Sequence, residues 1–435
     1  MEKINEEQLK KNATYSISDF IGQTGLEASY ESYLKGEKGK KKVEVDATGR
    51  IQRQLQEILP VPGFDIVSTI DKDLQEKSAE SALNMIEKLN EEGKEVKHAV
   101  VVAVNPRDGS ILSMVSIPSY DNNLFSKAIS ADDYQKILED PSNPMLNRAI
   151  SGIYPSGSVI KPFIAAAALD KGVISEHTTI DAPKEIKVGE WSFVDWKQHG
   201  IVDVKKSIAV SCNIFFYAIG GGWEHIKGIG SQAMKEYLNR FGFGEILGVE
   251  LSGEQKGNVP SAEWKKEVKN EDWYLGDTYH MAIGQGDVLV TPLQMTMALS
   301  AIANGGKLYK PRFVEKVIDK EGNIIKNFNS VIINDKIVDD PYSIEIVRKG
   351  MKLAVDSPTG SARQLQDLPV SSAGKTGTAQ FDATDLKRTH SWFEAFAPYD
   401  DPEIAIMVLV EAGGDGFDAA EPIAKEVLEF YFQNK

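Results

Sequence analysis

A serine and a lysine stand three residues apart in the stretch Ser158-Val159-Ile160-Lys161, and this spacing suits nucleophilic catalysis. A serine hydroxyl is a weak nucleophile until an adjacent base takes its proton. Residues i and i+3 share one face of a helix, so the amine of Lys161 can reach the hydroxyl of Ser158. Burial or a nearby positive charge would keep that amine neutral, as a base requires. Taken alone, the pair is equally well explained as an ordinary helix start with a surface lysine.

Two further motifs follow in order, the triplets Ser211-Cys212-Asn213 and Lys375-Thr376-Gly377. Ser211 can pass a proton between lysines and a leaving group, while the amide of Asn213 can both donate to and accept from a peptide backbone. Lys375 can supply the positive charge that keeps the first lysine neutral. The serine triplet by itself also fits a plain helix with two small polar residues. In this order the three motifs indicate a serine acyl-transferase of the kind that β-lactams inactivate.

The segment around the Lys-Thr-Gly motif predicts a strand. Gly377 lets a substrate come close to that strand, and an extended peptide can pair with it by β-augmentation. Lys375 and the hydroxyls of Thr376 and Thr378 are then candidates for holding a substrate carboxylate. The backbone N–H groups of Ser158 and Thr378 are candidates for an oxyanion hole.

The elements that must position these residues can be read from the apolar pattern. We expect helices over 158–170, 204–218, 232–241, 292–303, 343–354 and 419–432, and strands over 65–69, 100–104, 111–116, 375–380, 392–396 and 403–410. Strands at both ends with helices between them predict an α+β fold. In it, the terminal segments close one central antiparallel sheet that carries helices on both faces. Residues 1–61 are polar, include a short strand-like stretch at 42–45, and carry no chemistry.

Composition narrows the choice of class. The chain has 435 residues and a formal net charge of −15, which argues against nucleic acid as a partner. A single cysteine excludes internal disulfides. No stretch of the sequence approaches the ~20 apolar residues of a membrane span, and the charged first residues lack the apolar core of a signal peptide.

The motifs and their surroundings resemble the class B penicillin-binding proteins, monofunctional D,D-transpeptidases that cross-link peptidoglycan. Segments similar to that family extend over nearly the whole chain. They are 147–162, Phe241-Gly242-Phe243-Gly244, Ile283-Gly284-Gln285-Gly286, Thr291-Pro292-Leu293-Gln294, Lys375 to Gln380, His390-Ser391-Trp392-Phe393 and Ala397-Pro398. Gly25-Leu26-Glu27 with Tyr30, Tyr33, Leu34 and Gly36 resembles the end of the family's non-catalytic pedestal, and is most similar to the elongation branch, the penicillin-binding protein two type.

The resemblance implies a penicillin-recognising transpeptidase domain at 62–435 and a pedestal remnant at 1–61. Family members are anchored in the inner membrane with the catalytic domain outside, so we expect this chain to be a fragment without its anchor. The implied substrates are D-alanyl stem peptides, with β-lactams as covalent inhibitors. A glycosyltransferase and membrane proteins of the elongation complex are the implied partners. The chemistry itself implies no cofactor.

A second group of residues has ligand types that suit zinc: Asp181, Asp195, His199 and Cys212. A similar set occurs in part of the elongation branch, although the interval between Asp195 and His199 is shorter here. A closed four-ligand site would be structural and would hold the loop before the Ser211 segment. The alternative is two exposed aspartates, a loop histidine and a small buried cysteine, and both interpretations stay open.

Two other functions share the three motifs. A serine β-lactamase or β-lactam sensor has the same residues, but the long interval between Asn213 and Lys375 and the pedestal remnant favour the transpeptidase. A non-catalytic scaffold could keep the fold, and the intact motifs argue against it.

Overall fold

The computed structural model describes residues 2–3, 15–16, 19–125, 129–382 and 388–435. Its helices are α2 (Gly25–Ser29), α3 (Glu31–Leu34), α4 (Lys72–Glu91), α5 (Ala131–Glu139), α6 (Arg148–Ser151), α7 (Lys161–Asp170), α8 (Val204–Ala209), α9 (Asn213–Gly221), α10 (Gly230–Arg240), α11 (Ala262–Lys269), α12 (Leu275–Ala282), α13 (Pro292–Ala303), α14 (Tyr342–Asp356) and α15 (Ala420–Gln433). Three 3₁₀ turns are η1 (Asn122–Phe125), η2 (Gly157–Ile160) and η3 (Arg363–Asp367).

The strands are β1 (Glu2–Lys3), β2 (Phe20–Ile21), β3 (Lys40–Val45), β4 (Ile51–Ile58), β5 (Asp65–Ser68), β6 (Ala99–Val104), β7 (Ile111–Ile117), β8 (Tyr154–Pro155), β9 (Ile180–Ala182), β10 (Glu185–Val188), β11 (Trp191–Val194), β12 (Gly200–Val202), β13 (Leu289–Val290), β14 (Leu308–Tyr309), β15 (Val314–Ile318), β16 (Ile324–Asn327), β17 (Ile332–Asn334), β18 (Ala373–Gln380), β19 (Thr389–Ala397) and β20 (Ile404–Val410).

The centre of the fold is an antiparallel sheet in the order β18-β19-β20-β6-β7. Strands β6 and β20 consist entirely of apolar residues and are buried along their whole length. Such continuous apolar runs are expected where both faces of a strand are covered. The first hairpin of the domain thus pairs with its last strand, and the predicted sheet, closed by the terminal segments, is confirmed.

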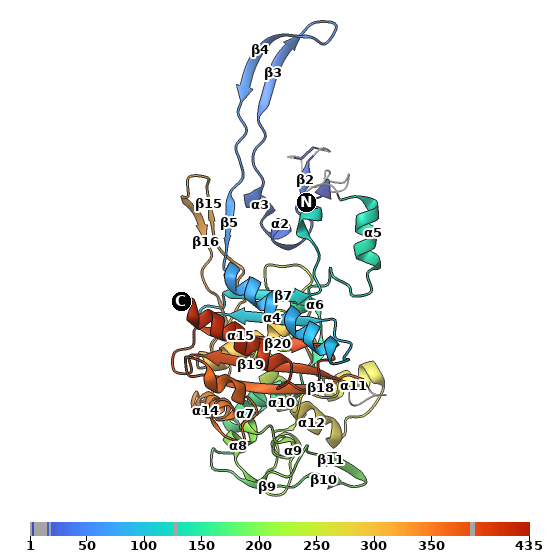
Figure 1. The fold of residues 1–435 in the computed structure, drawn as a ribbon, viewed down its shortest axis with the longest axis vertical. Helices are drawn as coiled ribbons and strands as arrows, with labels where there is room; N and C mark the ends of the chain where they lie inside the picture. Colours follow the sequence, from blue (N-terminus) through green and yellow to red (C-terminus); the bar gives the residue numbers. More distant parts are fainter. Residues whose placement is uncertain (1, 4–14, 17–18, 126–128, 383–387) are drawn as a thin grey trace.

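Helices cover both faces of this sheet (Figure 1). Helices α4 and α15 pack on one face, where Leu74 and Val427 join the core around Val101 and Val408. Helices α7 and α13 belong to the core of the other face, which also takes in α14 and buries Phe163. The α+β architecture with helices on both faces is therefore confirmed.

Two predicted helices differ in detail from the structure. The helix expected over 158–170 begins with the 3₁₀ turn η2 before continuing as α7. The helix expected over 204–218 is divided into α8 and α9, because Ser211 between them has a left-handed backbone with φ of 58°. A right-handed helix cannot pass through that conformation. The short strands β9 to β12 and the helices α11 and α12 were not predicted.

The amino-terminal part stands apart from the sheet. The ribbon β3–β4 extends away from the body of the molecule (Figure 1), and every residue of β4 is exposed. Below it, Tyr30 and Tyr33 contact the ring of Phe328 edge-on, and β5 pairs with β15. Among the described residues, no helix combines the length and apolar character needed to cross a bilayer.

Candidate active site

Ser158 lies in the 3₁₀ turn η2 and faces a cleft of about 950 Å³. Side chains three residues apart eclipse one another in a 3₁₀ turn, so Ser158 and Lys161 share a face here more closely than in an α-helix. The backbone N–H of Lys161 closes the turn on the carbonyl of Ser158. Ser158 is partly exposed, whereas the side chain of Lys161 is completely buried.

The ammonium group of Lys161 reaches the Ser-x-Asn motif. Its Nζ donates to the Ser211 carbonyl oxygen at 2.9 Å and to Oδ1 of Asn213 at 2.6 Å. Burial lowers the pKa of Lys161 to about 8, while the nearby charges of Asp195 and Cys212 act in the opposite direction. Burial therefore makes the neutral amine, the form that a general base requires, available at a much lower pH than in an ordinary lysine.

Lys375, from the first half of β18, meets the same serine from the other side. Its Nζ donates to Oγ of Ser211 at 3.0 Å and to the carbonyl oxygen of Thr376 at 2.6 Å. The side chain is fully buried. Burial, followed by the positive charge of Lys161, lowers the pKa of Lys375 well below its usual range.

Ser211 lies between the two lysines, because its Oγ is also 3.3 Å from Nζ of Lys161. The left-handed backbone that interrupts the helix is uncommon for serine and costs free energy. At this position it lets one residue offer both its carbonyl and its hydroxyl to Lys161. The structure thus brings Lys161, Ser211, Asn213 and Lys375 together beside Ser158.

Strand β18 is an edge strand of the central sheet, and its Thr376 and Thr378 line the cleft. The hydroxyl of Thr378 is 3.2 Å from Oδ1 of Asp415. An edge strand has backbone N–H and C=O groups that an extended peptide can pair with. The backbone of Thr378 also lies beside the serine turn, since a Cβ atom on Gly157 would be 2.5 Å from the Thr378 carbonyl oxygen.

Gly377 also has a packing role, which the sequence did not predict. A Cβ atom at this position would be 2.9 Å from Cγ1 of Val159 and 3.0 Å from Cβ of Trp392. The glycine therefore allows β18 to pack against η2, on the inner side of the strand, and its role in the approach of substrate stays a prediction. Trp392 is itself buried, and its indole N–H donates to the carbonyl of Pro155 at 3.0 Å.

Sequence reasoning missed several residues of this site. Trp196, Tyr217, His280, Arg363 and Asp415 line the cleft, and nothing in their local sequence distinguishes them. Glu394 had a signal, because it is an acidic residue within a predicted apolar strand, and it lies directly opposite Lys375 in the sheet.

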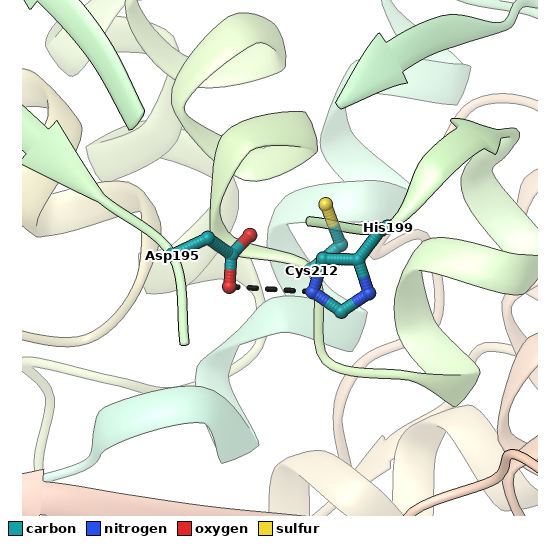
Figure 2. Close-up of side chains that lie close together, drawn as sticks. All are labelled: Asp195, His199 and Cys212. Atoms are coloured by element: carbon teal, nitrogen blue, oxygen red, sulfur yellow. Dashed lines mark ion pairs between the residues drawn. The ribbon is translucent and has the colours of Figure 1, made fainter. Parts of the chain in front are cut away.

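The structure also brings together three of the four predicted metal ligands. The ligand atoms of Asp195, His199 and Cys212 all lie within 4.8 Å of one another, and Figure 2 shows the three side chains gathered together. Asp181 is not part of this group: it is exposed on β9. The group lies next to the catalytic cluster, because Oδ2 of Asp195 accepts from the backbone N–H of Ile214 at 3.0 Å.

The three side chains fit a zinc ion. Nε2 of His199 is 3.4 Å from Oδ1 of Asp195, yet among the described residues this buried nitrogen makes no hydrogen bond. Burial and then the charge of Asp195 raise the pKa of the Cys212 thiol to about 12, so a thiolate there needs a cation beside it. Oxygen, nitrogen and sulfur donors in one buried group are the ligand types that zinc takes.

The sequence matches two described protein families. Residues 99–429 match the penicillin-binding protein transpeptidase domain, and residues 1–68 match the penicillin-binding protein dimerisation domain. Among curated proteins, the chain is 34% identical to the peptidoglycan D,D-transpeptidases MrdA of Haemophilus influenzae and of Escherichia coli K12. The alignments cover 99% and 98% of this chain and 66% and 68% of those proteins, so the chain spans about two thirds of their length.

Solved structures give the same result. Penicillin-binding protein 2 of Helicobacter pylori in complex with MreC superimposes with a TM-score of 0.83 at 31% identity, covering 99% of this chain and 76% of that one. Penicillin-binding protein 2 of Pseudomonas aeruginosa in complex with WCK 5153 gives a TM-score of 0.77 at 31% identity, covering 94% and 84%. The chain therefore belongs to the penicillin-binding protein transpeptidase family, the serine acyl-transfer enzymes of peptidoglycan cross-linking.

Proposed function

We propose that this chain cross-links peptidoglycan stem peptides through an acyl-enzyme on Ser158. The observation that carries the assignment is the position of Oγ of Ser211, within 3.3 Å of Nζ of Lys161 and 3.0 Å of Nζ of Lys375, beside the cleft that Ser158 lines. This arrangement gathers a base, a proton carrier and a cation in one cluster beside the cleft that the nucleophile lines.

In the first step, neutral Lys161 takes the proton of the Ser158 hydroxyl while Oγ attacks the carbonyl of the penultimate D-alanine. The N–H groups of Ser158 and Thr378 hold the resulting oxyanion. The bond to the terminal D-alanine then breaks, and its nitrogen receives the proton from Lys161 through Ser211. Terminal D-alanine leaves, and the stem peptide stays esterified to Ser158.

In the second step, the amine of another stem peptide attacks the ester. The same groups take a proton from that amine and return one to Oγ of Ser158, so the new amide forms and the free serine is restored. Edge strand β18 holds the donor peptide by backbone pairing, with Thr376 and Thr378 on its carboxylate. A β-lactam enters the first step and, because its ring opens without releasing a leaving group, remains on the serine.

Mass spectrometry after penicillin treatment tests the assignment. We expect a mass increase of one drug molecule, located on the peptide that contains Ser158 and absent from Ser158→Ala. Rapid turnover of the drug without a persistent adduct would instead favour a β-lactamase, and an adduct on another residue would contradict the proposed nucleophile.

We also propose that Asp195, His199 and Cys212 hold a zinc ion. Because Asp181 lies apart from them, the fourth ligand of a tetrahedral site would have to come from another group. When bound, the ion would supply a positive charge that stabilises the Cys212 thiolate and would hold the loop of Asp195 and His199 against the start of α9. The expected content is about one zinc ion per chain in protein purified without added metal. The matched variant Cys212→Ser should lose the metal. Wild-type protein that contains no zinc as purified, and whose thermal stability does not rise when zinc is added, would contradict the proposal.

The family also supports a proposal about location and partners. The full-length protein would be anchored in the inner membrane, with this domain on the outer side, and would work with a glycosyltransferase and elongation-complex proteins. The Helicobacter pylori relative was solved in complex with MreC, which supports a scaffold partner. Full-length protein co-expressed with these candidates from its own species should co-purify with them in detergent, and separate elution would contradict the partner proposal alone.

A further inference from the structure

Glu394 is an acidic residue buried in the middle of β19. Its side chain has no exposed surface, and among the described residues neither carboxylate oxygen has a hydrogen-bond partner. Burying an acidic group without partners costs free energy, and the cost is larger when the group is charged. Such a residue in the centre of a sheet therefore calls for an explanation.

The sheet register places Glu394 directly opposite Lys375 of β18 and opposite Met407 of β20. Directly opposed residues of antiparallel strands project to the same face, with Cβ atoms about 4.5–5.5 Å apart. Glu394 therefore shares its face of the sheet with Lys375. On the far side of Lys375 lies Oγ of Ser211, 3.0 Å from Nζ.

Few other charges act on this pair. Lys161 approaches Lys375 from α7, and Glu421 acts on it more weakly from α15. Among the residues that the structure describes, Lys375 is the one charged group that acts appreciably on Glu394. Helix α13, turn η2 and strand β20 contain no titratable residue.

The charged residues of α14 and α15 have other partners. Arg348 lies over the rings of Phe396 and Tyr399. The remaining charged side chains that pair near the surface are Glu345 with Lys349, Lys352 with Asp356, Lys425 with Asp367 and Glu429, and Glu426 with Lys77.

The two lysines of the site differ in their nearest acidic group. Asp195, near Lys161, already accepts backbone N–H groups from Trp196 at 2.8 Å and Ile214 at 3.0 Å. Its negative charge is therefore shared among several donors. Glu394 has no such donors, so its charge can be balanced by Lys375 alone.

We propose that Glu394 is a positioning residue that keeps Lys375 protonated during acyl transfer, while Lys161 serves as the neutral base. The inference rests on the proposed function and explains how two buried lysines near one serine take opposite roles. The cation of Lys375 then lowers the proton affinity of Lys161 and attracts the substrate carboxylate. Burial raises the pKa of Glu394 well above its usual range and lowers that of Lys375, and within the pair the charge of each residue acts against the shift of the other.

The sign of the expected effect follows from the charge. A carboxylate near an ammonium raises the pKa of the ammonium, so removing the carboxylate makes Lys375 lose its proton at lower pH. If acylation needs Lys375 charged, the alkaline limb of the rate profile, where the rate falls as the pH rises, must move to lower pH. A nearby opposite charge shifts a pKa by about 1–3 units, so we expect a shift of at least about one pH unit.

The test is the rate of Ser158 acylation by a fluorescent penicillin, measured from acid to alkaline pH in wild-type protein and in Glu394→Gln. Glu394→Met has a side chain of similar length without a buried polar group, and it serves as the second variant where the amide disturbs folding. Glu394→Asp keeps the carboxylate and should keep the wild-type limb. Glu421→Gln removes a buried carboxyl group from the other face of the sheet and should shift the limb less than Glu394→Gln.

An alkaline limb of Glu394→Gln and Glu394→Met that coincides with the wild-type limb would overturn the inference, even with a changed melting temperature. A shift to higher pH would overturn it as well. Failure of the proposed function is distinguishable, because it would appear as absent acylation of wild-type protein at every pH.

Discussion

The cleft beside β18 and the ribbon β3–β4 differ in how far their side chains are buried. Beside the cleft, Lys161 and Lys375 are fully buried, and the central sheet has helices packed on both faces. The ribbon is a two-stranded hairpin whose apolar residues Ile51 and Leu55 are exposed. Two-stranded hairpins have little stability of their own in water.

The difference shows where the chemistry gets its properties. A shifted lysine pKa requires removal of water, which the sheet and its helices provide. The side chains of the ribbon stay in contact with water, so the ribbon cannot shift the pKa of a catalytic group by burying it. Changes in the cleft should therefore alter rate or stability strongly, whereas changes in the ribbon should leave both unaltered.

The largest effect is expected for Lys161→Met, which removes the base and keeps the side-chain length. A positioned general base contributes about 10²–10⁴-fold to a rate, so acylation by fluorescent penicillin should fall by that factor. Lys205→Met is the matched control, because this lysine pairs with Glu176 away from the cleft. A loss below about tenfold would show that Lys161 is not the base.

A substitution in the core of the central sheet tests how much this region contributes to the free energy of unfolding. Met407 is fully buried in β20, and removing most of such a side chain costs about 2–5 kcal/mol. Met407→Ala should therefore lower the free energy of unfolding by that amount in denaturant titrations. A loss of unfolding free energy below about 1 kcal/mol would mean that the sheet core tolerates the removal of a side chain as well as the surface does.

Gly377→Ala tests the close packing of β18 on the serine turn. The added Cβ atom would be 2.9 Å from Cγ1 of Val159, so the strand and the turn must separate. Misplacement of catalytic groups by about 1 Å can cost up to about 10²-fold in rate, and we expect a loss of tenfold or more in acylation. The double variant with Val159→Ala should recover part of it, and no recovery would point to another cause.

The pH dependence of acylation is a milder probe of the same burial. Because the active form of Lys161 is the neutral amine, the rate should rise as the pH rises through the pKa of about 8. Below that pKa the rate should change by about tenfold per pH unit. The assay should cover about pH 6 to about pH 9. An acylation rate that stays constant over this range would contradict the role of Lys161 as the base.

The smallest effect is expected for Leu55→Ala in the ribbon, the counterpart of Met407→Ala. Leu55 is 48% exposed, and surface substitutions usually change stability by less than about 0.5 kcal/mol. Both the unfolding free energy and the acylation rate should match the wild type. A substantial change in either would show that the ribbon is coupled to the cleft.

Local pattern was enough to predict most of the regular structure. The apolar pattern predicted the strands that form β6 and β20, and it predicted a helix over 292–303, which α13 matches at both ends. The pattern did not reveal the break at Ser211, because a serine within an apolar segment has no local reason to adopt a left-handed backbone. Contacts with Lys161 and Lys375, distant in the chain, hold that conformation.

The site divides in the same way. The order and spacing of Ser158, Lys161, the Ser-x-Asn triplet and the Lys-Thr-Gly triplet determined the class of chemistry, since residue types alone decide which groups can be nucleophile, base or cation. The tertiary structure decided which acidic residues join them. It gathered Asp195 with His199 and Cys212 but left Asp181 exposed, and it paired Glu394 with Lys375 through sheet register. Register and burial arise from packing between distant segments, and pKa values follow from burial, so neither is encoded in local spacing.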